Sequence, residues 1–128
     1  MMTILKVAVI GSRSAKESDY YIIEKYIPEN AAEIISGGAK GIDMLAKRYA
    51  LENNLPCREF LPDYENTDID KRSAPLIRNK HIVEYADIVL AFWDGTSRGT
   101  AFTVDYCIKT YKPVKVYILG KERLTMKK

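Results

Sequence analysis

The chain has 128 residues, of which 47% are hydrophobic, and this size suits one domain with a single core and is too small for two. Its 20 basic and 17 acidic residues leave a net charge of +3 without a long basic run, which argues against duplex DNA as the main partner. The two cysteines lie far apart and outside any metal-binding pattern, so the sequence predicts neither a disulfide framework nor a zinc site.

No stretch of the sequence has the pattern of a membrane span or a signal peptide. The first apolar run, 4–10, is too short to cross a bilayer, and no small-residue cleavage site follows a charged segment. We therefore expect a cytoplasmic protein with no membrane partner. The sequence predicts no bound cofactor and no metal.

Short β-branched segments alternate with segments of helical period, which predicts βαβ units around a parallel sheet. Five strands are expected, at 4–10, 32–36, 57–61, 87–92 and 114–119. The first and fourth are almost continuously apolar, with one charged residue each, as is typical of strands covered on both faces, so we expect them to be central. The predicted fold class is α/β, a single Rossmann-like doubly wound domain over 1–128 with helices on both faces of the sheet.

Four helices are expected between these strands, at 14 to about 27, 42 to about 54, 73 to 84 and 100 to 111. Ser14 and Glu17 have the spacing of a capping box that would open the first of them. The segment 62–72 is charged and rich in turn-forming residues, so it is predicted to be a surface loop. Residues 120–128 are expected to form a flexible tail.

Three glycine-containing loops join the end of a predicted strand to the start of a helix. They are Gly11-Ser-Arg-Ser14, Gly37-Gly-Ala-Lys-Gly41 and Asp94-Gly-Thr-Ser-Arg-Gly-Thr100. In an open parallel sheet such loops meet where the strand order reverses. Glycine lets a ligand approach the backbone, and the amides of a helix N-terminus favour an anion. Together the loops predict a phosphate site; the alternative is that the glycines only turn the chain.

Four basic residues lie on or near these loops: Arg13, Lys40, Arg78 and Arg98. A guanidinium fork placed there can reach a phosphate, although each cation taken alone could equally be a solvated surface group. Arg78 is the strongest candidate, because Asn79 beside it adds amide groups to the same helix segment. Neither a G-x-G-x-x-G nor a Walker A pattern is present, so an ordinary dinucleotide dehydrogenase or P-loop ATPase is not supported.

The same segments resemble the SLOG superfamily of Rossmann-like domains, over residues 4–119. The resemblance rests on Gly11-Ser-Arg13, Ser36-Gly-Gly-Ala-Lys-Gly-Ile-Asp43, Arg78-Asn79 and Ser97-Arg-Gly-Thr100. The second of these is similar to the S-G-x-A-x-G-I-D signature of the DNA-processing protein A branch and its small relatives similar to YpsA. The resemblance implies that Gly37, Gly38 and Gly41 line a ligand phosphate. It also implies that Asp43 caps the loop or touches a sugar hydroxyl.

Residues 86–113 resemble the nucleoside 2-deoxyribosyltransferases, in which the helix after a G-T-A-F segment begins with a nucleophilic glutamate. Thr103 stands at that position here, and a threonine hydroxyl does not replace a carboxylate without an activating base. The LOG phosphoribohydrolases of the superfamily likewise need a glutamate that this chain lacks after Thr100. The resemblance therefore predicts binding in preference to catalysis, and no catalytic residue is assigned.

We expect the protein to bind or sense a nucleotide-derived small molecule, such as an ADP-ribose-like or NAD-like compound or a nucleoside phosphate. The alternatives are cleavage of an N-glycosidic bond in a nucleotide and weak binding of single-stranded nucleic acid through the same basic rim. Tyrosines on the predicted helices could build a subunit contact, so a homo-oligomer is left open. The predicted ligand-binding residues are Gly11, Ser12, Arg13, Gly37, Gly38, Gly41, Asp43, Arg78, Asn79, Asp94, Gly95, Ser97, Gly99 and Thr100.

Overall fold

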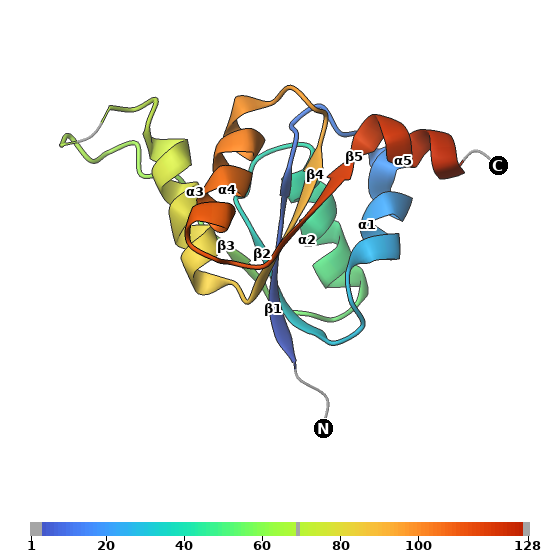
Figure 1. Ribbon diagram of the computed structural model, residues 1–128. Helices are drawn as coiled ribbons and strands as arrows, with labels where there is room; N and C mark the ends of the chain where they lie inside the picture. The colour runs from blue at the N-terminus through green and yellow to red at the C-terminus, as the bar shows by residue number, and fades with distance from the viewer. Residues whose placement is uncertain (1–3, 69, 127–128) are drawn as a thin grey trace.

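The computed structural model describes residues 4–68 and 70–126 and contains one parallel five-stranded sheet (Figure 1). The strands are β1 (Leu5–Gly11), β2 (Ala31–Ser36), β3 (Cys57–Glu59), β4 (Ile88–Trp93) and β5 (Val114–Ile118), in the order β3-β2-β1-β4-β5. The two most apolar runs, β1 and β4, are interior strands that pair with each other, as predicted. The strand order reverses between them, which confirms the α/β Rossmann-like fold class.

Helices cover both faces of the sheet. On one face lie α1 (Tyr20–Tyr26), α2 (Ile42–Glu52) and α5 (Leu119–Met126); on the other lie α3 (Ala74–Tyr85) and α4 (Arg98–Lys109) (Figure 1). Side chains of a strand point alternately to opposite faces, so β1 contributes to two separate cores. Val7 and Val9 pack toward α1 and α2, whereas Ala8 and Ile10 pack toward α3 and α4. This double burial explains why β1 has no polar side chain between Val7 and Ile10.

The first helical segment begins later than the capping-box pattern predicts. A short 3₁₀ turn, η1 (Glu17–Asp19), precedes α1, and the amide of Lys16 donates to the Asp19 carboxylate at 2.9 Å. Ser14 lies before this turn, and its hydroxyl donates to Asp94 instead, at 3.4 Å. The predicted Ser14–Glu17 box is therefore wrong, because the buried Asp19 takes the capping role.

The C-terminal segment is helical where a flexible tail over 120–128 is expected. Leu119 is buried in the core, and Arg123 donates to both carboxylate oxygens of Asp19, at 2.8 and 2.7 Å. Tyr26 adds a hydrogen bond to Glu122 at 2.6 Å. These partners lie about a hundred positions away in the chain, so no local pattern could reveal them. The expectation is wrong for 120–126, while 127 and 128 lie outside the described residues.

Replacing Arg123 with alanine should lower the free energy of unfolding by about 1–2 kcal/mol at neutral pH, because the buried Asp19 loses two charged donors while Arg123 itself is partly exposed. Arg123 and the Lys16 amide hold the pKa of Asp19 below its ordinary value against the opposing effect of burial. This stabilisation is therefore present above the unfolded pKa of about 4 and is lost as the pH falls through the lower folded pKa.

Urea unfolding of both proteins across pH 2–7 measures this effect. The difference between the wild type and Arg123→Ala should be constant above pH about 4 and shrink below it. Lys121→Ala, on the exposed side of the same helix, should change stability by less than about 0.5 kcal/mol. A loss that stays equal at pH 7 and pH 2 would mean that the ion pair is not what holds α5.

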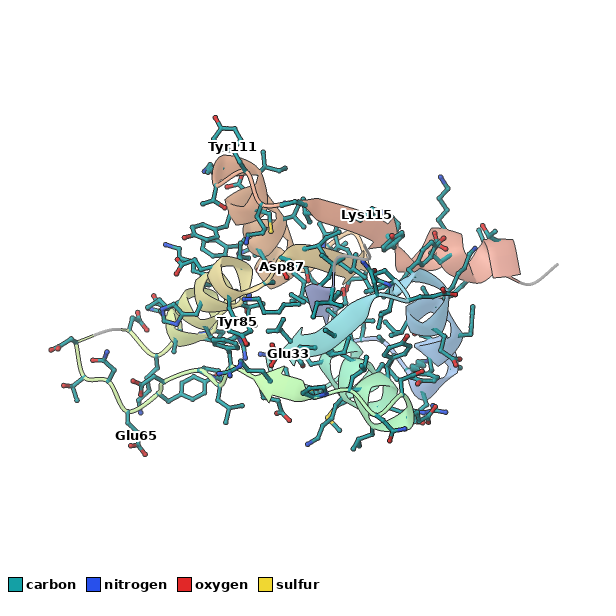
Figure 2. The ribbon with its side chains drawn as sticks, turned by 90° about the horizontal axis from the view of Figure 1, so that it is seen from below. Glu33, Glu65, Tyr85, Asp87, Tyr111 and Lys115 are labelled. Carbon is teal, nitrogen blue, oxygen red and sulfur yellow. The ribbon has the colours of Figure 1, made fainter. Side chains whose placement is uncertain are left out.

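Paired side chains occupy the end of the sheet opposite the strand carboxyl ends. There Tyr85 donates to Glu33 at 2.7 Å, and the Lys6 ammonium lies 4.2 Å from the centre of the Tyr85 ring (Figure 2). The predicted surface loop extends away from the body of the molecule at Glu65 (Figure 2). The groups named at this end are therefore occupied with one another.

Candidate functional site

The three glycine-containing loops meet around a cavity of about 440 Å³ at the carboxyl ends of β1, β2 and β4. It lies at the point where the strand order reverses, and its volume falls in the range of small-molecule sites, roughly 300–1,000 Å³. Most of the predicted ligand-binding residues line it: Gly11, Arg13, Gly37, Asp43, Arg78, Asn79, Asp94, Ser97, Gly99 and Thr100. The sequence therefore located residues that come together in space.

The remaining predicted residues, Ser12, Gly38, Gly41 and Gly95, do not line the cavity but shape its loops. The buried Ser12 hydroxyl accepts from the Asp94 amide at 2.9 Å and from the Ser97 hydroxyl at 3.1 Å, which joins the first loop to the third. The three glycines all have positive φ, the conformation that favours glycine.

The loop after β2 is held in shape by its own side chains. The amide of Gly38 donates to the Ser36 hydroxyl at 3.3 Å, and the amide of Ala39 donates to Asp43 at 3.1 Å. A ligand phosphate at these two amides would have to displace an internal acceptor. Placement of the phosphate against the Gly37–Gly41 loop thus stays a prediction.

Arg78 is buried and binds the protein itself. Its Nη1 donates to the carbonyl of Gly37 and, at 3.2 Å, to that of Phe60, while its Nε donates to Asn79 at 2.8 Å. Burial lowers the pKa of the guanidinium from its ordinary value and nearby Asp43 raises it, but an arginine remains protonated. Arg78 therefore links the loop after β2 to α3 through hydrogen bonds. Its positively charged side chain forms part of the cavity lining.

Two carboxylates line the cavity in different environments. Burial raises the pKa of Asp43, although the Ala39 amide and Arg78 counteract it. The amides of Thr96 and Ser97, which donate to Asp94 at 2.9 and 2.8 Å, hold the pKa of Asp94 well below its usual range. Asp94 thus organises the loop before α4, whereas Asp43 keeps an acceptor for a ligand donor such as a sugar hydroxyl.

The start of α4 forms the part of the cavity best suited to an anion. The first-turn amides, 98–100, have no partner inside the helix, and the helix dipole favours negative charge there. Gly99 and Thr100 line the cavity, as does the exposed Arg13 of the first loop. Thr103 also lines it, but its hydroxyl donates to the Gly99 carbonyl at 2.9 Å. The start of α4 therefore offers backbone amides that can bind an anion, whereas the Thr103 hydroxyl already has a partner in the Gly99 carbonyl.

Sequence reasoning missed the apolar part of the cavity, formed by Pro75, Leu76 and Ile82 of α3 with Ile10 of β1; Ser14 and Ala39 also line it. The α3 residues share a helical face with Asn79, so their spacing was the signal that could have found them. Ile10 and Ile82 are buried and form the floor, while Arg13 is exposed at the rim. Thr103 and Arg78 are buried in the lining as well, so the cavity combines an apolar α3 wall with polar groups.

Three other side chains with chemically versatile groups, those of Trp93, His81 and Asp105, lie outside this site. The Trp93 indole donates to the Ser97 carbonyl at 3.0 Å and is not part of the lining, His81 is exposed, and Asp105 pairs with Lys109 at 2.8 Å. Within 4–68 and 70–126, no cluster of histidine, cysteine or acidic residues could hold a metal ion. None of the helices in those ranges is both long and apolar enough to cross a membrane.

Residues 1–63 match the family model of DNA recombination-mediator protein A. A search of curated proteins gave no match. Among solved structures, DNA processing protein A from Streptococcus pneumoniae matches 88% of this chain with a TM-score of 0.70 at 22% identity, and this chain spans 50% of its length.

Two further solved structures share the fold. DNA processing protein A from Helicobacter pylori, described by its single-stranded DNA binding mode, has a TM-score of 0.71 at 23% identity over 97% of this chain and 73% of its own. A molybdenum cofactor binding protein from Rippkaea orientalis has a TM-score of 0.66 at 19% identity over 98% and 84%. At these identities the structures establish the fold. With the family-model match, they confirm the predicted resemblance to the DNA-processing protein A branch of the SLOG superfamily.

Proposed function

We propose that this protein is a cytoplasmic domain that binds or senses a phosphate-bearing nucleotide compound in the cavity between α3 and α4. The observation that carries the proposal is the mixed lining of the cavity, in which the start of α4 and Arg13 lie with the apolar residues Ile10 and Ile82. A nucleotide has the same mixture of groups, since it joins a charged phosphate and a polar sugar to a flat, largely apolar base. The phosphate would lie toward the first turn of α4.

Binding without catalysis fits the side chains of the cavity. Thr103 occupies the position of the transferase nucleophile, and its hydroxyl is engaged with the Gly99 carbonyl. Asp94 is engaged with the amides of Thr96 and Ser97. The Thr103 hydroxyl thus has a carbonyl and not a base as its partner, and the hydrogen bonds to Asp94 make its carboxylate a weaker nucleophile.

Substituting Gly99 tests this proposal without disturbing the fold. A Cβ at Gly99 would meet no atom within 4 Å, yet the residue lines the cavity beside the expected phosphate. Gly99→Val should therefore keep the thermal stability of the wild type and lower the affinity for the bound nucleotide at least tenfold. Calorimetric titration with nucleoside monophosphates, ADP-ribose and NAD measures this affinity.

Gly120→Val is the matched control, because a Cβ at this helical glycine also meets open space and Gly120 lies on α5 at a distance from the cavity lining. It should bind nucleotides like the wild type. Unchanged binding in Gly99→Val would contradict the proposed phosphate position, and binding of no compound by the wild type would contradict the function.

Single-stranded DNA is the second candidate ligand. The family-model match to DNA recombination-mediator protein A and the description of the Helicobacter pylori protein favour it. A strand would place one of its nucleotides in the same cavity and further phosphates along the rim near Arg13 and Arg98. Its affinity should then fall steeply with salt, because several counterions are released, whereas binding of a single mononucleotide should depend on salt much less.

A further inference from the structure

Asn79 places a side-chain amide among the apolar residues that α3 contributes to the cavity lining. Pro75, Leu76, Asn79 and Ile82 follow one another at helical spacing and all line the cavity. A ligand base that packs against this wall therefore meets the Asn79 amide between apolar neighbours. Which end of that amide faces the ligand decides which base edge can pair with it.

The orientation of the amide is fixed by Arg78. The Asn79 Oδ1 accepts from Arg78 Nε at 2.8 Å, and a flipped amide would place its NH₂ group against the guanidinium. Arg78 cannot follow such a flip, because its Nη1 is held by the carbonyls of Gly37 and Phe60. Asn79 therefore directs Nδ2 away from Arg78, and within the described part of the chain this amine donates to no other group.

The part of the cavity lined by α4 has open space at Gly99. Gly99 and Thr103 of α4 line this side, and a Cβ at Gly99 would meet nothing within 4 Å. The Thr103 hydroxyl is bound to the Gly99 carbonyl, so it does not compete for a base edge. The lining contributed by α3 and α4 thus combines apolar side chains with the N–H donors of Asn79, beside the buried Arg78 guanidinium.

We infer that Asn79 is a specificity-determining residue that selects a ligand whose base carries an oxo group, an acceptor, in preference to one with an amino group. This inference rests on the proposed function, because it concerns the base of the nucleotide bound in the same cavity. An amino group at the same place would set donor against donor and leave both without a partner in a half-buried slot.

Two matched pairs of ligands test the inference. Inosine monophosphate and AMP differ in an oxo against an amino group at C6 and in an N–H against a bare nitrogen at N1. UMP and CMP differ in the same way at C4 and N3, so each pair exchanges donors for acceptors along one base edge. The wild type should bind the oxo member of a pair about fivefold more tightly or better, which is the worth of one hydrogen bond. Calorimetric titration of each compound gives the ratio of dissociation constants.

The variant Asn79→Asp should reverse the preference between the two members of each ligand pair. The carboxylate keeps an acceptor for Arg78 Nε and replaces the outward donors with an acceptor, so the ratio should invert in favour of AMP and CMP. Any repulsion from the phosphate affects both members of a pair equally and cancels in this ratio. Equal affinities within each pair for the wild type, or a ratio unchanged in Asn79→Asp, would overturn the inference while leaving the proposed function intact. Binding of none of the four compounds would overturn the proposed function itself.

Discussion

Arg78→Ala is expected to lower the free energy of unfolding by about 2–4 kcal/mol, because it leaves the carbonyls of Gly37 and Phe60 without their shared buried donor. The loop after β2 and the end of β3 lose the group that ties them to α3. Equilibrium unfolding in urea, followed by circular dichroism, measures the loss. Nucleotide affinity should fall at least tenfold as well, since Gly37 and Asn79 lose the side chain that positions them.

Arg72→Ala is the matched control, because Arg72 precedes the same helix but is exposed and paired only with the neighbouring Asp70. This variant should lose less than about 0.5 kcal/mol. Arg78→Lys should fall between the two, since one ammonium group keeps the charge but cannot reproduce the fork of the guanidinium. A variant Arg78→Ala as stable as Arg72→Ala would show that the buried hydrogen bonds contribute little net free energy.

Local patterns were sufficient to predict most of the fold. The apolar runs at 4–10 and 87–92 were expected to be central because strands buried on both faces leave no position for a polar side chain. The structure places them as the adjacent strands β1 and β4. The patterns failed at η1 and α5, where the determining contact joins Asp19 to Arg123 across almost the whole chain.

The candidate site was predictable to the extent that it depends on backbone shape. Gly11, Gly37 and Gly99 were selected because they stand in segments that join a strand to a helix, where glycine lets a ligand approach the backbone, and all three line the cavity. The role of Arg78 was not predictable in this way. An arginine near a phosphate-suited loop looks the same in sequence whether it binds a ligand or a carbonyl 41 positions away. Only the fold shows which acceptors lie within reach.

Gly41→Ala is expected to lower the free energy of unfolding by about 3 kcal/mol or more, from backbone strain and steric overlap together. Gly41 has a φ of +77°, and a Cβ there would lie 2.3 Å from the carbonyl oxygen of Ser12 and 2.6 Å from the Cα of Arg13. Both are backbone atoms, so no side-chain rotation relieves the overlap. The loops after β1 and β2 would have to separate, which would also break the bond from the Ile42 amide to the Ser12 carbonyl.

Gly95→Ala separates the two causes of this loss. Gly95 also has a positive φ, +88°, but a Cβ there would meet no atom within 4 Å, so this variant carries the conformational strain alone, about 1–2 kcal/mol. Urea unfolding of both variants should therefore give a clearly larger loss for Gly41→Ala, and nucleotide binding should fail in that variant while Gly95→Ala retains it. Equal losses would mean that the two loops can move apart freely, and the close contact of Gly41 with Ser12 would then not be what shapes the cavity.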